Sequence, residues 1–164
     1  MAKWSSAINN WTPVAVADTT NFTNAGYHGL QGGSTTQRLN VMEVYMGGLA
    51  GSSAPAQMIL SRDSTVGVTA MSGGTQAALD PATAALAAPM VTFNTSTTKP
   101  QRSATLQMMT LAFNAYGGVV RWLAAPGEEV ILLGNTASFG ELSLSHASSG
   151  TPGLMSSYFI FEPL

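Results

Sequence analysis

Charged side chains are scarce in this chain of 164 residues, since six Lys or Arg and eight Asp or Glu make up only 9% of it. A soluble domain ordinarily carries about 25%. A surface with so few charges generates little repulsion between copies of a protein. The composition therefore predicts a protein that packs against copies of itself or against another protein. The alternative is a monomer whose surface is coated with Ser and Thr.

Cysteine is absent, which excludes disulfides, thiolate zinc sites and a cysteine nucleophile. No apolar run approaches the roughly 18 residues of a membrane helix, so we expect no membrane partner. The six basic residues are scattered and the formal net charge is -2, which argues against a nucleic-acid partner. The first residues lack a basic segment followed by an apolar core, so we expect no signal peptide.

Apolar and polar residues alternate with a period of two from residue 35 onward, interrupted by Gly, Pro and Ser. This pattern is typical of antiparallel strands. The expected strands cover residues 37–46, 56–62, 65–71, 90–94, 104–115, 118–123, 128–133, 139–146 and 155–161. We therefore predict an all-β fold, an antiparallel β-sandwich or jelly roll.

Two segments depart from this alternation. Residues 1–34 are polar and rich in Gly, Asn and Thr, which predicts an extended N-terminal arm with one short strand at 12–17. Residues 35–164 then form the sandwich domain, and we expect deletion of residues 1–20 to spare the fold. Residues 80–89 predict one short helix, because Asp80 is suited to the N-cap, Pro81 to the first helical position and Pro89 to the end.

Several strands are apolar on both faces, although one face of a sandwich strand normally meets water. A second apolar face is usually covered by a helix, an arm or another subunit. The residues predicted for such an interface are Trp4, Trp11, Met42, Met46, Arg121 and Tyr158. Trp4 and Trp11 either fold back on their own chain or insert into a neighbour. The residues predicted for the core are Val41, Leu60, Phe93, Phe113, Trp122, Leu132, Leu144 and Phe159.

Side chains that could carry catalysis are few. A Ser-His-Asp triad could draw on His146 with Asp63 or Asp80, but no nucleophile-elbow spacing supports it. Glu128 and Glu129 are adjacent on an expected strand and therefore point to opposite faces. No spacing typical of metal ligands or of a phosphate-binding loop is present. We expect no enzymatic activity, no metal and no cofactor.

Three stretches resemble small virion-associated proteins of tailed bacteriophages. They are residues 39–69, with Glu43-Val44-Tyr45-Met46-Gly47-Gly48, residues 79–102, with Leu79-Asp80-Pro81-Ala82, and residues 118–164, with Gly118-Val119-Val120-Arg121-Trp122. The resemblance implies a capsid decoration, or cement, protein on the capsid surface of the virion. Such proteins are often trimeric sandwiches, so the implied partners are copies of the chain, in a homotrimer, and the major capsid protein.

Two other functions stay open. One is a phage tail tube or baseplate component, because ring-forming tail proteins also use β-sandwiches. The other is a lectin-like glycan-binding module, in which aromatic rings stack on sugars. The rings available for that purpose are Trp4, Trp11, Tyr27, Tyr116 and Trp122.

Overall fold

The computed structural model describes residues 2–13, 26–65, 72–73, 75–84, 91–95, 101–134, 140–147 and 152–164. In this part of the chain the protein is all-β. The strands are β1 (Trp4–Trp11), β2 (His28–Gln31), β3 (Leu39–Gly48), β4 (Pro55–Thr65), β5 (Ser72–Gly73), β6 (Thr75–Ala78), β7 (Val91–Thr95), β8 (Gln101–Asn114), β9 (Val119–Leu123), β10 (Val130–Leu132), β11 (Glu141–His146) and β12 (Met155–Pro163).

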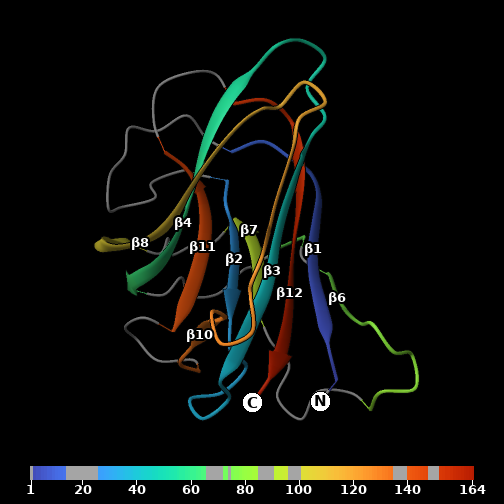
Figure 1. Cartoon of the computed structure of the whole chain (residues 1–164), viewed down its shortest axis with the longest axis vertical. Helices are drawn as coiled ribbons and strands as arrows, with labels where there is room; N and C mark the ends of the chain where they lie inside the picture. The colour runs from blue at the N-terminus through green and yellow to red at the C-terminus, as the bar shows by residue number, and fades with distance from the viewer. Residues whose placement is uncertain are drawn as a thin grey trace.

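Two antiparallel six-stranded sheets pack face to face as a sandwich (Figure 1). Sheet A has the order β10-β3-β12-β1-β6, and β9 pairs with β3 beside β10. Sheet B has the order β5-β7-β2-β11-β4-β8. The antiparallel sandwich expected from the alternating pattern is confirmed.

The core lies between the two sheets and draws on every second residue of the long strands. Sheet A contributes Leu39, Val41, Val44, Met46, Phe159 and Phe161, and sheet B contributes Leu30, Met58, Leu60, Leu142 and Leu144. Five predicted core residues are fully buried: Val41, Leu60, Leu132, Leu144 and Phe159. Phe113 and Trp122 are only partly buried, because β8 and β9 lie at the ends of their sheets. The side chain of Phe93 lies outside the described part of the chain.

The N-terminal residues do not form an arm where the structure describes them. β1 lies inside sheet A between β12 and β6, and β2 lies inside sheet B between β11 and β7. The predicted arm is therefore wrong for these two segments. Their polar composition is compatible with a strand because only every second residue has to be apolar. Most of the strand expected at 12–17 lies outside the described residues.

The predicted helix at 80–89 is a turn over the part that the structure describes, residues 80–84. The Asp80 carboxylate accepts a hydrogen bond from the Ala82 amide at 2.9 Å, and the Asp80 carbonyl accepts one from the Thr83 amide at 3.0 Å. Asp therefore closes a local turn here, which is the alternative to capping a helix. Within the described ranges no helix occurs that could cross a membrane.

Candidate interaction surface

The outer faces of the two sheets differ in how much they are covered. β11, in the middle of sheet B, is buried at every position, including Glu141, Ser143 and Ser145, which alternate with the core leucines. On the outer face of sheet A, by contrast, Val119 and Leu123 of β9 are 61% and 62% exposed. On β12, in the middle of sheet A, the outward-facing Tyr158 and Ile160 are half-buried, so the middle of sheet A is less covered than the middle of sheet B. We use "outer face of sheet A" for Glu43, Tyr45, Val119, Arg121, Leu123, Tyr158 and Ile160.

A hydrogen-bonded cluster sits in the middle of this face. The register pairs Tyr45 of β3 with Arg121 of β9 on one side and with Tyr158 of β12 on the other. Arg121 donates from Nε to Glu43 Oε1 at 2.7 Å and from Nη2 to Oε2 at 3.0 Å. The Tyr158 hydroxyl donates to Glu43 Oε1 at 2.6 Å. The rings of Tyr45 and Tyr158 stack with their centroids 4.7 Å apart and their planes 9° apart.

The electrostatics keep this cluster neutral as a unit. The hydrogen bonds from Arg121 lower the pKa of the Glu43 carboxyl against the opposing effect of burial, and the Tyr158 hydroxyl adds to the lowering. Burial, followed by the hydrogen bond to Glu43, raises the pKa of Tyr158 to about 12. Glu43 is thus ionised, Tyr158 protonated and Arg121 charged near neutral pH. A bidentate pair of this kind fixes the geometry of a surface without adding net charge.

The structure places the six residues predicted for an interface in three different environments. Arg121 and Tyr158 meet in the cluster on the outer face of sheet A. Met42 is half-buried on β3 at the position where the register with β12 shifts.

The other three are buried inside their own sandwich. Trp4 and Trp11 are 9% and 4% exposed and Met46 is fully buried, all three in the core. Their prediction as interface residues is corrected accordingly, because the alternation of β1 and β3 turns them inward. Sequence reasoning missed Glu43 and Tyr45, although both share the strand parity that alternates with Val44 and Met46.

His28 forms a second polar group, sealed between the sheets. Its Nδ1 lies 2.8 Å from Ser157 Oγ and its Nε2 lies 3.2 Å from Ser6 Oγ. The Trp11 indole donates to the same Ser157 oxygen at 3.0 Å, and the ring of Phe159 lies 4.4 Å from the imidazole. Complete burial lowers the pKa of His28 to about 3, so the ring is neutral. This group connects β2 of sheet B with β1 and β12 of sheet A.

A third polar group is buried in sheet B. Ser143 donates to Asp63 Oδ1 at 2.7 Å, and Ser61 Oγ lies 3.5 Å from Ser143 Oγ. Burial and then the charge of Glu141 raise the pKa of the Asp63 carboxyl well above its usual range. Nearby on β8, Arg102 donates from Nη1 to Ser145 Oγ at 3.0 Å. The described residues contain no set of three His, Cys, Asp or Glu placed to hold a metal.

The residues considered for a triad are not brought together. His146 of β11 pairs with Met58, five positions before Asp63 on β4, which corresponds to roughly 16 Å along the strand. Burial lowers the pKa of His146. Asp80 lies instead in the exposed turn after β6, where its carboxylate already bonds the Ala82 amide.

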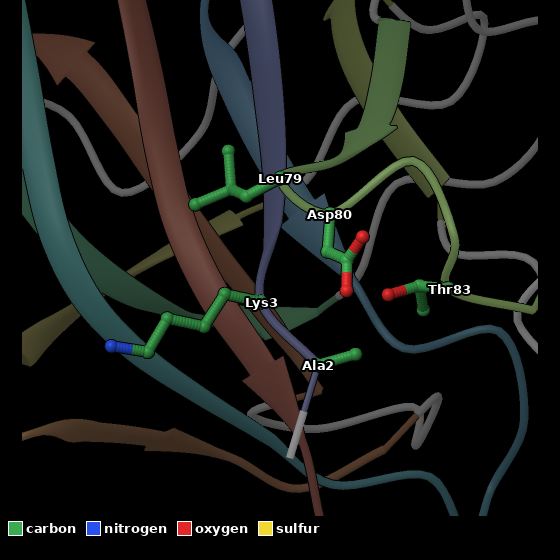
Figure 2. A pocket seen from close by; sticks show the side chains of 5 residues that line it. All are labelled: Ala2, Lys3, Leu79, Asp80 and Thr83. Atoms are coloured by element: carbon green, nitrogen blue, oxygen red, sulfur yellow. The ribbon is translucent and has the colours of Figure 1, made fainter.

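A cavity of about 490 Å³ lies beside this turn and is lined by Ala2, Lys3, Leu79, Asp80 and Thr83 (Figure 2). Figure 2 shows the Lys3 side chain directed away from Asp80 and Thr83. The lining groups therefore do not converge as the polar groups of a ligand site do.

The rings considered for sugar stacking are mostly turned inward. Trp4, Trp11 and Tyr27 are buried, and Trp122 packs against the core from β9. Tyr116, in the turn between β8 and β9, is 61% exposed. These five rings therefore do not form a common stacking platform.

Comparisons with protein-family models, curated proteins and solved structures find no match to this chain.

Proposed function

We propose that this chain is a capsid decoration protein of a tailed bacteriophage, which binds the head shell as a homo-oligomer and braces it without catalysing a reaction. The resemblance described above favours a trimer and the major capsid protein as the partner. The virion surface is then the place where the protein acts.

The observation that carries this proposal is the outer face of sheet A. It combines the exposed side chains of Val119 and Leu123 with the stacked pair of Tyr45 and Tyr158. Its charged centre, Glu43 with Arg121, is already paired. Interface centres are depleted in unpaired charge and enriched in aromatic residues and Arg, as this face is. The scarcity of charge in the whole chain supports the same reading.

A sedimentation assay with shells of the same phage that lack this chain tests the proposal. The wild-type chain is expected to pellet with the shells, and Leu123→Asp is expected to weaken pelleting strongly because it places an unpaired charge in the interface. Leu79→Asp is the matched control. Leu79 is 54% exposed, but it lies after β6 at the opposite end of sheet A.

Electron microscopy of the complete particle locates the chain independently. Density on the head shell supports the proposal. Density along the tail would replace it by the tail tube or baseplate function, and binding to a glycan array without binding to shells would replace it by the lectin-like function. Equal pelleting of Leu123→Asp and wild type would remove the outer face of sheet A from the shell contact.

A further inference from the structure

β8 forms an open edge of the sandwich. It pairs with β4 on one side, and no strand of the described residues pairs with it on the other. Its 14 residues make it the longest of the described strands. In sheet B, β4 lies between β8 and β11, and Figure 1 labels β8 to the left of β4. An edge strand presents a row of backbone N–H and C=O groups that another strand can complete.

The edge has little of the protection that natural edge strands carry. Between residues 103 and 114 β8 has neither a charged residue nor a proline. Natural edges usually carry Lys or Pro, or are short or bulged. The first half of β8 is irregular, because its register with β4 shifts three times, between Leu60 and Ser61, between Ser61 and Asp63, and between Asp63 and Thr65. The regular part of the edge therefore runs over residues 109–114.

The side chains of this regular part also lack full cover. Met109, Leu111 and Phe113 pair with core residues of β4 and pack against the core, but all three are only partly buried. A single added peptide strand would complete the backbone groups only. A second sandwich would also bring its own row of partly buried apolar side chains to the junction.

The lengths of the sheet ends indicate which strand fits. The other strands at sheet ends, β5, β6, β9 and β10, have two, four, five and three residues. All four are shorter than the six-residue regular part of β8, so among the described sheet-end strands β8 of another copy is the one that can pair along all of residues 109–114. When a strand pairs antiparallel with its own copy, the same residue of each copy lies close to the twofold axis, so a charged residue there would repel its counterpart. Residues 103–114 contain no charged residue and therefore allow this pairing.

We propose that β8 pairs antiparallel with β8 of a second copy of this chain, across a twofold axis within residues 109–114, and thereby joins two copies of sheet B. The inference rests on the proposed function, in which copies of the chain associate, and names a surface through which two copies meet. It is compatible with a trimer, because the twofold contact then joins copies that belong to neighbouring trimers.

Sedimentation velocity over a range of protein concentrations tests the contact. Ala112, exposed on β8, is replaced by Lys, and the matched control is Ala125→Lys in the exposed loop after β9. At high concentration we expect wild type and Ala125→Lys to have at least twice the mass of Ala112→Lys, because the lysines of two Ala112→Lys copies would repel each other at the twofold axis. Equal masses for all three chains at every concentration would overturn the proposal.

A spin label provides a measurement that does not depend on a destabilising variant. The chain has no cysteine, so Ala112→Cys and Ala125→Cys each accept one label. We expect a short intermolecular distance for the label at 112 and a longer one for the label at 125. Absence of intermolecular coupling at position 112 would refute the β8 pairing.

The two proposals can fail separately. A chain that doubles its mass through β8 but does not pellet with shells would contradict the decoration function and leave the β8 contact standing. A chain that pellets with shells while all three masses are equal would contradict the β8 contact and leave the function standing.

Discussion

Acid should destabilise this protein through His28. The neutral ring is sealed between the sheets, and burial lowers its pKa from 6.5 to about 3. The unfolded chain binds a proton below its own pKa, whereas the folded chain does not until a much lower pH. Acidification therefore favours unfolding: the stability is fully present above pH 6.5 and is lost as the pH falls toward about 3.

The size of the effect follows from the two pKa values of His28. Each pH unit between them costs about 1.4 kcal/mol of unfolding free energy, so the loss from about pH 7 to about pH 5 is about 2 kcal/mol. Asp63 acts in the opposite direction, because its raised pKa lets the folded chain hold a proton that the unfolded carboxyl releases. Because wild type and a His28 variant both keep Asp63, its contribution cancels when their pH dependences are compared.

Urea denaturation at a series of pH values, with wild type and His28→Asn side by side, measures the difference. Asn keeps a polar side chain near Ser6 and Ser157 but has no proton to gain. We expect His28→Asn to have a lower free energy of unfolding than wild type at neutral pH. Between about pH 7 and about pH 5, we expect the free energy of unfolding to fall by about 2 kcal/mol less in His28→Asn than in wild type. Parallel pH dependences, or an NMR titration of His28 near 6.5, would refute the reasoning.

Three further predictions concern β1, the edge strand and the outer face of sheet A. Deletion of residues 2–11 should unfold the chain, because it removes an interior strand of sheet A, and a native circular-dichroism melt would contradict this. Phe159→Ala should lower the free energy of unfolding by about 3–5 kcal/mol, and Phe113→Ala by about half of that, because Phe113 is only partly buried. Chemical denaturation measures both losses, and equal losses would contradict the difference in burial. Arg121→Ala should raise the pKa of the Glu43 carboxyl, measured by carbon NMR, and an unchanged pKa would exclude Arg121 as its main cause.

The alternating pattern predicted most of the strands, because a residue's side of a sheet depends only on its parity along the strand. The strands expected at 37–46, 118–123, 139–146 and 155–161 correspond to β3, β9, β11 and β12. The pattern was less informative for residues 1–34, where Ser, Asn and Gly occupy the positions between the few apolar residues. β1 and β2 are strands there because neighbouring strands supply their hydrogen bonds.

For the candidate surface, the sequence indicated that apolar and aromatic residues would remain on a second strand face, and it singled out Arg121 and Tyr158. It could not show that Trp4, Trp11 and Met46 point inward, since their neighbours along the chain do not reveal which face meets the opposite sheet. Strand pairing decided this. Strand pairing also brought two distant residues into hydrogen bonds with Glu43. Arg121 is 78 positions from Glu43 in the sequence, and Tyr158 is 115 positions from it.

By itself, then, the sequence determined an all-β chain with few charges and no cysteine, because local alternation and composition are properties of neighbouring residues. Only the tertiary structure decided which faces are sealed, which polar groups meet and which edge stays open. Those outcomes depend on contacts between strands far apart in the chain, and it is these contacts that remove side chains from water.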